Sequence, residues 1–438
     1  MRAQIINIGT ELLIGTTLNT HQQYLARELG KLGIDLYTAV TVGDNPQRVA
    51  SALTSALFSA ELIILTGGLG PTDDDISVAS AAKALGLELR CHRPTLESIR
   101  KRLESRGREM NSFQARQALV PAGAVVFPNP NGTAPGLLLT IRRKDRVCRV
   151  ALLPGPPREL HPMFQNHLAP RLKAILGPSR QTLVLKRLFF PGAVESEIAP
   201  KVNDWLSSAP PVTVGIYARA GEVELAVMSK HVNASTAQRL AVRAAGIIRK
   251  RFRGRLIIEF PQSLSGLIAD QLTKRRQTVC SAESCTGGLL GARLTDAAGA
   301  SDYFRGSITA YHNSIKTCLL GVSEELLRNH GAVSPQAAKA MAEGVKTKLA
   351  CTYALATTGI AGPSGGTASK PVGLVYIALA GPERTYVFRH HFLGNRSDIR
   401  NKAVQAALTH LGYVLSGMGF GGSADQPMKT EGKIRTKT

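Results

Sequence analysis

The chain has 438 residues, of which 44% are hydrophobic and 19% charged, a composition typical of folded globular proteins. Its length exceeds what one compact core usually holds, so we expect two or three domains. No apolar run approaches the roughly 20 residues that cross a bilayer. The first residues lack the basic region and long apolar core of a signal peptide. We therefore expect a cytoplasmic protein with no membrane contact.

The formal net charge of +23 favours phosphate-bearing partners, either nucleic acids or small nucleotides. Aromatic residues make up only 5% of the chain, and no common nucleic-acid-binding motif is present. Nucleic-acid binding therefore stays open beside the alternative of a basic, solvated surface. The six cysteines are scattered without a C-x-x-C pair, which indicates neither a disulfide framework nor a zinc site.

Apolar runs and helical patterns alternate over residues 1–172, and this alternation predicts a three-layer αβα domain with a parallel sheet. The expected strands are 3–9, 34–43, 61–68 and a run within 146–153, and the expected helices are 19–32 and 46–60. Over residues 176–258 the pattern changes to alternating strands with two helical segments, which indicates a small α+β module. Its expected strands are 182–190, 212–219 and 223–230, and its expected helices are 193–206 and 235–252.

A further α/β domain is expected over residues 264–415. Its strands are predicted at 277–284, 303–311, 353–359, 372–379 and 385–392, and its helices at 285–296, 335–350 and 396–415. The remaining residues, 416–438, are rich in glycine, serine and lysine and poor in apolar residues, so we expect a disordered basic tail.

The segment Q-T-V-C-S-A-E-S-C-T-G-G places Ser284 where a predicted strand ends, before a glycine pair and a helical pattern. A hydroxyl beside free main-chain N–H groups is the arrangement that an acyl-transfer nucleophile needs. Serine and threonine are also favoured helix N-caps, so the same residues fit a purely structural turn.

The later segment Y-H-N-S-I-K offers a base for this serine. A partly buried lysine can deprotonate a serine, which makes Ser284 and Lys316 one candidate pair. Cys285 with His312 is the competing pair, since a thiol and an imidazole also form a nucleophile and base. Sequence periodicity does not decide between the two pairs.

Two more segments of this domain suit an anionic ligand. Residues 356–373 form a glycine-, proline- and serine-rich loop after a strand, which fits either phosphate binding through main-chain N–H groups or a simple turn. Arg396 and Arg400 stand four residues apart at a helix start, on one face of that helix. Their guanidinium groups suit a phosphate, although a solvated helix start is the alternative.

In the first domain, L-I-I-L-T-G-G-L-G-P-T-D-D-D runs from a strand into a glycine loop and then three acids. Gly67, Gly68 and Gly70 suit a diphosphate, and the acids at 73–75 suit a divalent cation. The acids equally fit a helix N-terminus. The segment is neither a G-x-G-x-x-G nor a Walker motif, which argues against a dinucleotide-dependent dehydrogenase or an ATPase.

The motifs A-E-S-C-T-G-G, Y-H-N-S-I-K, T-T-G-I-A-G-P-S-G-G and G-N-R-S-D-I-R resemble the CinA C-terminal family in order and spacing over 278–412. Members of that family deamidate nicotinamide mononucleotide to nicotinic acid mononucleotide and ammonia. The resemblance implies Ser284 as the catalytic serine and Lys316 as its base, with Tyr311 nearby and no metal. The substrate-binding residues that it suggests are Thr286, Gly287, Thr358, Gly362, Arg396 and Arg400.

The motifs I-G-T-E-L-L-I-G, T-G-G-L-G-P-T-D-D-D, N-P-N-G-T-A-P-G and L-P-G-P-P-R-E-L resemble the CinA N-terminal domain, which is similar to molybdopterin-binding folds. Full-length members hydrolyse ADP-ribose to AMP and ribose 5-phosphate with a divalent metal, Mg²⁺ or Co²⁺. Ser77 departs from the family's usual threonine, and Glu159 falls within a matching motif. The ligand-binding residues suggested are Gly67, Gly68, Gly70, Thr72 and Asn19, and the metal ligands are Glu11, Asp74 and Asp75.

Together these features predict a bifunctional pyridine-nucleotide salvage enzyme that forms a homodimer. Its ligands would be nicotinamide mononucleotide and ADP-ribose. The middle module has the family's F-P-G-A-V-E-S-E form, to which no chemistry is assigned. Two alternatives remain: a DNA-associated competence or damage-response protein, and a molybdopterin-binding protein without hydrolase activity.

Overall fold

The computed structural model describes residues 1–143, 146–177, 181–206, 211–420 and 427–428. The chain divides into two compact units, Met1–Val184 with Lys230–Gln238 and Leu185–Ser229 with Arg239–Thr438. Most of the predicted disordered tail, 421–426 and 429–438, lies outside the described residues. Within the described part of the chain, no helix has both the length and the apolar character needed to cross a membrane.

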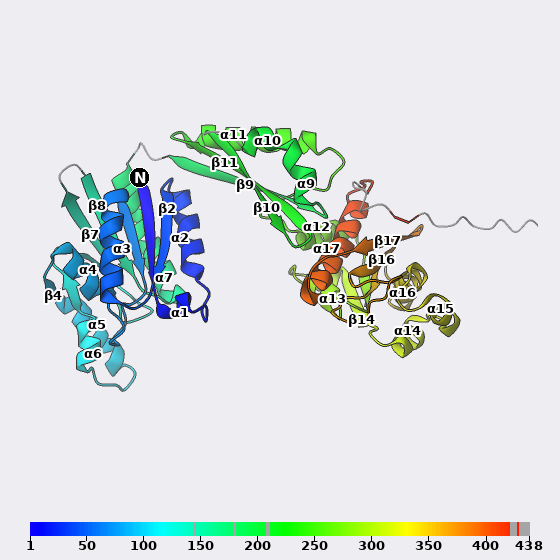
Figure 1. Ribbon diagram of the computed structural model, residues 1–438, viewed down its shortest axis with the longest axis horizontal. Coiled ribbons are helices and arrows are strands. Elements are labelled where there is room, and N and C mark those ends of the chain that lie inside the picture. Colours follow the sequence, from blue (N-terminus) through cyan, green and yellow to red (C-terminus); the bar gives the residue numbers. More distant parts are fainter. Residues whose placement is uncertain (144–145, 178–180, 207–210, 421–426, 429–438) are drawn as a thin grey trace, which may run out of the picture. The chain divides into compact units, whose positions relative to one another are not determined.

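The first unit is built on a six-stranded sheet, ordered β2-β1-β3-β8-β7-β6 (Figure 1). The parallel strands are β1 (Arg2–Ile8), β2 (Asp35–Val42), β3 (Leu62–Thr66) and β8 (Arg146–Leu153). The predicted parallel sheet is therefore confirmed for these strands. One edge is extended by two antiparallel strands that the sequence did not predict, β7 (Gly136–Arg143) and β6 (Val125–Phe127).

Successive residues of the central strands enter two different cores, one on each face of this sheet. Ile5 and Ile64 pack with helices α2 (Thr20–Lys31) and α7 (Pro157–Met163), whereas Ile6 packs on the other face with α3 and α4. Helix α3 spans Pro46–Ser59, α4 spans Ser77–Leu85 and α8 spans Ala169–Leu176. Strands buried on both faces appear as continuous apolar runs, which explains why the sequence revealed them.

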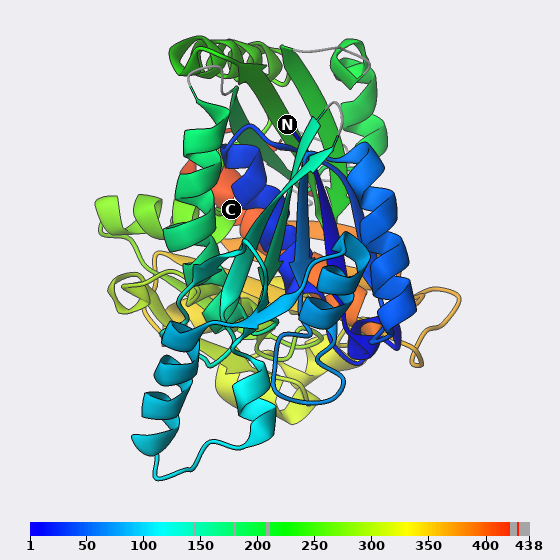
Figure 2. The same cartoon turned by 90° about the vertical axis from the view of Figure 1, so that its left-hand side faces the viewer.

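The remaining elements of the first unit lie around the carboxyl ends of the parallel strands. Helices α5 (Arg93–Glu104) and α6 (Ser112–Arg116) extend away from the sheet at that end, as both views show (Figure 1, Figure 2). A two-stranded sheet joins β4 (Leu89–Cys91) to β5 (Leu119–Pro121), and α1 (Thr10–Leu13) follows β1.

The second unit contains the middle module, whose four strands are ordered β10-β11-β9-β12. They are β9 (Thr182–Pro191), β10 (Val212–Arg219), β11 (Glu222–His231) and β12 (Ile258–Glu259), and they are accompanied by helix α11 (Ala234–Arg251). The helix predicted over 193–206 is wrong as one element. It is broken into α9 (Glu195–Ile198), a 3-10 turn over Ala199–Lys201 and α10 (Asn203–Leu206), because Pro200 lacks the N–H that a continuous helix needs.

The second unit also holds a five-stranded sheet, ordered β14-β13-β15-β16-β17. Strands β13 (Val279–Glu283), β14 (Phe304–Thr309) and β15 (Tyr353–Gly359) are parallel, and β16 (Leu374–Ala380) and β17 (Thr385–His391) run antiparallel. The helices are α12 (Leu264–Lys274), α13 (Leu289–Leu294), α14 (Asn313–Leu320), α15 (Glu324–His330), α16 (Pro335–Lys348) and α17 (Arg396–Leu415).

The helix predicted over 285–296 is confirmed only for its second half. Gly287 and Gly288 have φ angles of 58° and 96°, so the chain forms a turn there and α13 begins at Leu289. Residues with a side chain adopt a positive φ only at a cost in conformational energy, whereas glycine does not. The glycine pair is therefore the reason for the shorter helix. Ser284 therefore stands in a turn between β13 and α13.

Candidate active site

The serine turn begins where β13 ends and is held against the neighbouring strand. The Ser284 main-chain N–H donates to the carbonyl of Thr357 on β15 at 2.9 Å, and the Gly287 N–H donates back to the Ser284 carbonyl at 3.1 Å. Because Glu283 is paired with both Thr309 and Thr357, three parallel strands end together at this point. Carboxyl ends of parallel strands are where α/β proteins commonly bind ligands.

The fully buried carboxylate of Glu283 stabilises this turn through hydrogen bonds. It accepts hydrogen bonds from the main-chain N–H groups of Gly288 (2.9 Å), Leu290 (3.0 Å) and Gly291 (2.7 Å) and from the hydroxyls of Thr286 (2.7 Å) and Ser307 (3.0 Å). Burial of a carboxylate is costly unless such donors replace water. The structure assigns Glu283 the task of fixing the turn that presents Ser284.

The threonines near the serine are also engaged in this network. The Thr286 hydroxyl donates to Glu283, so the hydroxyl of Thr357, at 2.7 Å from it, must be the donor in their mutual bond. Thr358 is fully buried, and its hydroxyl donates to the carbonyl of Ala332 at 2.6 Å. Thr286 and Thr358, which were expected to bind substrate, thus bond to the protein in this structure.

Lys316 lies in α14 and is 1% exposed. Its Nζ donates to the carbonyls of Ala310 (2.8 Å) and Tyr311 (3.0 Å), both just after β14. Burial lowers the pKa of Lys316 below 10.5, with the nearby Cys285 acting in the opposite sense. A neutral amine has two N–H groups and one lone pair, so the two carbonyls use both N–H groups and leave the lone pair available.

The alternative pair of Cys285 and His312 is poorly suited to catalysis in this structure. Burial raises the pKa of the Cys285 thiol to about 12, which disfavours the reactive thiolate. The His312 imidazole is the N-cap of α14 and interacts through Nδ1 with the Ser314 hydroxyl at 2.8 Å and with the Ser314 N–H. Both observations count against this thiol and imidazole as the reactive pair.

An arginine connects the remaining candidate residues. Arg396, in the first turn of α17, donates to the carbonyl of Gly362 at 2.7 Å and to the hydroxyl of Tyr311 at 2.7 Å. Arg400, one turn later, donates to the carbonyl of Thr286 at 2.8 Å. The Arg400 Nε is buried without a hydrogen-bond partner among the described residues. The tyrosine, the glycine loop and both arginines thus meet beside the serine turn.

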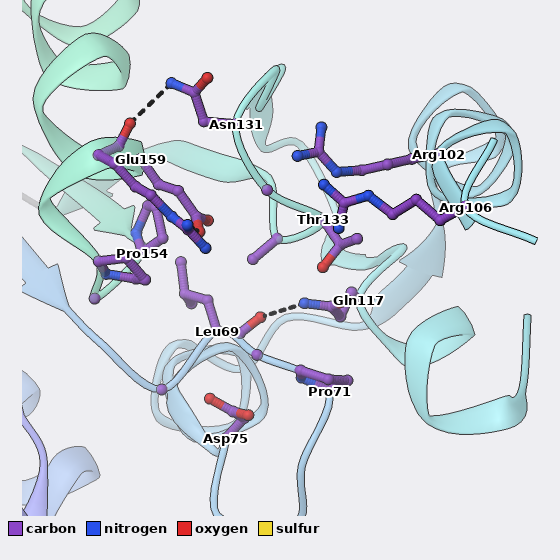
Figure 3. A pocket seen from close by; sticks show the side chains of 17 residues that line it. Leu69, Pro71, Asp75, Arg102, Arg106, Gln117, Asn131, Thr133, Pro154 and Glu159 are labelled. Atoms are coloured by element: carbon purple, nitrogen blue, oxygen red, sulfur yellow. Dashed lines mark hydrogen bonds and ion pairs between the residues drawn. The ribbon is translucent and has the colours of Figure 1, made fainter. Parts of the chain in front are cut away.

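The first unit has its own cavity of about 750 Å³ at the loops that follow β3 and β8 (Figure 3). Three guanidinium groups line it, those of Arg102, Arg106 and Arg158, together with the carboxylates of Asp75 and Glu159. Figure 3 shows Arg102 and Arg106 pointing into the cavity from the side of α5, opposite Glu159. An excess of cations in a concave site favours a phosphate-bearing ligand.

Glycines let the two carboxylates lie against the loops of this cavity. A Cβ at Gly70 would stand 2.3 Å from the Asp75 Oδ2, and one at Gly132 would stand 2.0 Å from the Glu159 Oε2. Asp75 also accepts from the Thr72 N–H (2.9 Å) and hydroxyl (2.5 Å). Gly68 lines the cavity beside Gly70.

Several residues predicted for this site lie elsewhere. Gly67, Thr72, Asp74, Glu11 and Asn19 are not among the residues that line the cavity. Asn19 caps α2 by accepting from the Gln22 N–H. A hydrogen bond from Thr72 lowers the pKa of the exposed Asp74. The described residues contain no group of three or more His, Cys, Asp and Glu side chains able to hold a metal ion, so Glu11, Asp74 and Asp75 are not brought together as one.

Sequence reasoning assigned no role to four residues that the structure places in these sites, Glu283, Arg102, Arg106 and Arg158. Glu283 was visible as an isolated charge at the end of an apolar strand, next to the glycine pair. Arg102 and Arg106 belong to the basic segment R-K-R-L-E-S-R-G-R, where helical spacing alone also fits a solvated face. Only the folded loops bring these arginines to face the strand ends.

Comparison with known proteins gives three family matches along the chain. Residues 261–415 match the CinA C-terminal domain, residues 4–174 match the probable molybdopterin binding domain, and residues 186–256 match the damage-inducible protein CinA KH domain. A CinA-like protein of Nostoc punctiforme is 41% identical over 94% of this chain and 98% of its own length. A putative competence-damage inducible protein of Symbiobacterium thermophilum is 41% identical over 95% and 99%.

A solved structure resembles part of the chain as well. The competence/damage inducible protein CihA from Agrobacterium tumefaciens is 38% identical and covers 36% of this chain and 98% of its own, with a TM-score of 0.34.

Proposed function

The chain belongs to the CinA family, and from that premise we propose that residues 264–415 form an amidohydrolase that deamidates nicotinamide mononucleotide. The products are nicotinic acid mononucleotide and ammonia. Ser284 is the nucleophile and Lys316 is the base. No metal takes part in this proposed reaction.

In the proposed mechanism the neutral Lys316 amine takes the proton of the Ser284 hydroxyl as its oxygen attacks the carboxamide carbon. The tetrahedral intermediate collapses as the C–N bond breaks, and the protonated lysine gives its proton to the leaving nitrogen, which departs as ammonia. Water then attacks the ester on Ser284 and gives a proton to Lys316, which passes it to the Ser284 oxygen as the ester bond breaks. The serine is regenerated and the carboxylic acid is released.

The environment of Lys316 is the observation that carries this proposal. The amine is buried, burial lowers its pKa, and its two hydrogen bonds go to carbonyls and to no carboxylate. A lysine with only a structural role would more often pair with a carboxylate. This pattern therefore supports Lys316 as a base that loses its proton more readily than an exposed lysine does.

The arginines of α17 support a substrate with a phosphate. Arg400 has an unpartnered buried Nε, and Arg396 is held in place by Gly362 and Tyr311. Guanidinium groups bind phosphate with directional, charge-assisted hydrogen bonds. We propose that these two residues recognise the 5′-phosphate, which distinguishes the mononucleotide from free nicotinamide.

A substrate series tests this proposal on the full chain. Ammonia release should be rapid with nicotinamide mononucleotide, at least about 100-fold slower with nicotinamide riboside, which lacks the phosphate, and unchanged by a metal chelator. Equal rates with and without the phosphate would contradict phosphate recognition. No ammonia from any of these amides would contradict the amidohydrolase assignment.

The cavity of the first unit supports a second function. We propose that Arg102, Arg106 and Arg158 bind the diphosphate of a nucleotide such as ADP-ribose and that this unit hydrolyses it to AMP and ribose 5-phosphate. The two carboxylates lining the cavity, Asp75 and Glu159, fit a divalent cation, because Mg²⁺ is commonly held by one or two carboxylates and by substrate phosphates. Such a metal would screen the developing charge on the leaving phosphate.

Replacing Arg106 tests this second function. Arg106→Gln removes one guanidinium of the cavity and should raise the KM for ADP-ribose about tenfold or more, because one charge-assisted contact is lost. Deamidation of nicotinamide mononucleotide should stay as in the wild type. Arg108→Gln, at an exposed position outside the cavity, is the matched control. An unchanged KM in Arg106→Gln would contradict the role of this cavity.

A further inference from the structure

A second cavity, of about 460 Å³, lies inside the second unit, and nothing above assigns it a role. One wall comes from the middle module, from the turn after β9 and the tip of the β10–β11 hairpin. The other wall comes from the end of β17 and from α17. Its lining includes Val194, Glu222, Arg389, Phe392 and Lys402.

The two walls are joined by a shared core and by direct contacts. Leu256 and Ile258 of the middle module pack in one cluster with Leu411 and Tyr413 of α17. At the hairpin tip, a Cβ on Gly221 would stand 2.9 Å from the Cγ of Gln405, so only glycine permits this approach. The volume is within the range of small-molecule sites, roughly 300–1,000 Å³. The cavity is therefore a formed feature of this unit.

The charged groups in this cavity are arranged at its two walls. The side chain of Arg389 makes no hydrogen bond or ion pair with any residue that the structure describes, and Arg389 belongs to the wall that also carries Lys402. The Lys402 Nζ donates to the carbonyl of Leu393, which leaves further N–H groups free. Arg219, in contrast, is already neutralised by Glu224. Arg389 and Lys402 are thus two cations in the lining that a bound anion can use.

The opposite wall offers an acceptor, and the space between is largely apolar. The Glu222 carboxyl accepts from the Gln405 side chain at 3.2 Å through one oxygen, and burial raises the pKa of Glu222. Val194, Val223 and Phe392 line the region between, and the Phe392 ring is stacked on His390 with centroids 5.1 Å apart. A flat ring with an exposed amine or amide fits such a surface.

We propose that this cavity is a second nucleotide site, which binds a nucleoside monophosphate whose base carries an amino or amide group. The phosphate pairs with Arg389 and Lys402, the base packs against Phe392, and the amino group donates to Glu222. The site is separate from the serine turn, although α17 borders both: Arg396 and Arg400 contact the serine site, and Lys402 and Ala406 line this cavity.

Calorimetric titration of the full chain with AMP tests this site. Arg389→Gln should weaken one AMP-binding event at least about tenfold, because a charge-assisted contact is lost. Val194→Trp should abolish the same event, because the ring fills the cavity from a position that is 55% exposed and so tolerates substitution. Arg384→Gln, at the residue before β17 begins and outside the cavity lining, is the matched control and should bind as the wild type does.

The first unit could also bind AMP, so Arg106→Gln is titrated in parallel. The proposal requires that the event sensitive to Arg389→Gln and Val194→Trp survives in Arg106→Gln. It is overturned if both cavity variants give the wild-type isotherm, if Arg106→Gln removes all AMP binding, or if the wild type binds no AMP. An unchanged unfolding temperature in Arg389→Gln separates lost binding from lost folding.

Discussion

The side chain of Glu283 satisfies five donors around the serine turn, and it does so without any exposure to solvent. Glu283→Gln places an NH₂ group where an acceptor is required, so at least one buried main-chain N–H loses its partner. We expect a loss of about 2–4 kcal/mol in the free energy of unfolding of this domain. Glu325→Gln, at an exposed position in α15, should change it by less than about 0.5 kcal/mol.

Urea unfolding of the two glutamine variants measures this difference. If Glu283→Gln were as stable as Glu325→Gln, the carboxylate would not be what fixes the turn. Deamidation should also fall in Glu283→Gln, since the orientation of Ser284 depends on that turn.

Lys316 leads to a prediction about pH. The amine acts as a base only when neutral, and burial lowers its pKa below 10.5. The rate of deamidation, kcat/KM, should therefore rise with pH through the lowered lysine pKa and reach a plateau below pH 10.5. Lys316→Met should remove this rising limb and reduce the plateau rate about 10²–10⁴-fold.

Lys339→Met, on the exposed face of α16, is the control and should keep the wild-type pH profile. A Lys316→Met enzyme with the same rising limb would show that another group is the base. In that case the hydrogen bonds of Lys316 to the Ala310 and Tyr311 carbonyls would be structural only.

The sequence predicted only some of the residues that lie together in the two candidate sites. The motifs placed Ser284 at one strand end and Lys316 at another strand end and the turn after it, and the structure pairs these two strands, β13 and β14. The roles of Glu283, Arg102 and Arg106 could not be predicted, because their partners are main-chain groups and loops distant in sequence. A metal site made of Glu11, Asp74 and Asp75 requires that the three carboxylates lie close together in space, which their spacing in the sequence does not specify.

At the scale of elements, the start of α17 positions the arginines of the serine site. Asn395 and Asp398 form a capping box, in which each side chain accepts from the other's main-chain N–H at 3.0 Å. Asn395→Ala should lower the free energy of unfolding by about 1 kcal/mol. Because Arg396 is the first residue of α17, the same change should raise the KM for nicotinamide mononucleotide more than it changes kcat.

Ser323→Ala removes the equivalent cap of α15, which carries none of the candidate site residues, and provides the comparison. It should lower stability by a similar amount and leave KM unchanged. Equal effects of both variants on KM would mean that the α17 cap has no special link to the site.

Elements buried on both faces were predictable, whereas short or interrupted ones were not. The strands Tyr353–Gly359 and Leu62–Thr66 begin with apolar runs of four residues and agree with their sequence-based boundaries within two residues. Val125–Phe127 has only three residues and gives no clear period. The helix expected from residue 285 failed because two glycines adopt positive φ, a conformation that hydrophobic periodicity does not report.

At the scale of the whole molecule, two buried histidines link stability to pH. The Nε2 atoms of His390 and His410 are 3.0 Å apart, and the His410 ring stacks on Phe388 with centroids 3.6 Å apart. Burial lowers the pKa of His390 to about 4 and that of His410 well below 6.5. The bond between them needs a lone pair on one of the two Nε2 atoms, so at least one ring must be neutral.

In the unfolded chain the two imidazoles take up protons near pH 6.5, whereas in the folded chain they do so only at lower pH. Stability is therefore complete above pH 6.5 and falls as the pH drops from 6.5 toward 4, at about 1.4 kcal/mol per pH unit for each such group. The unfolding temperature of the second unit should decrease over this interval. His390→Phe should flatten the decrease, and an unaltered slope in that variant would contradict the assignment.

The molecule combines a serine site in one unit with an arginine-lined cavity in the other. Each site is formed by loops at the carboxyl ends of parallel strands, a placement that the alternating pattern of the sequence already implied. The high net charge of +23 favours phosphate-bearing substrates at both sites.

The central claim, that Ser284 is the nucleophile of an amidohydrolase, is tested most directly by ammonia release from nicotinamide mononucleotide. Ser284→Ala should lose at least about 10³-fold in kcat, whereas Cys285→Ala, which removes the rival thiol one residue away, should keep activity within about tenfold of the wild type. Full activity in Ser284→Ala, or loss of activity in Cys285→Ala alone, would contradict the claim.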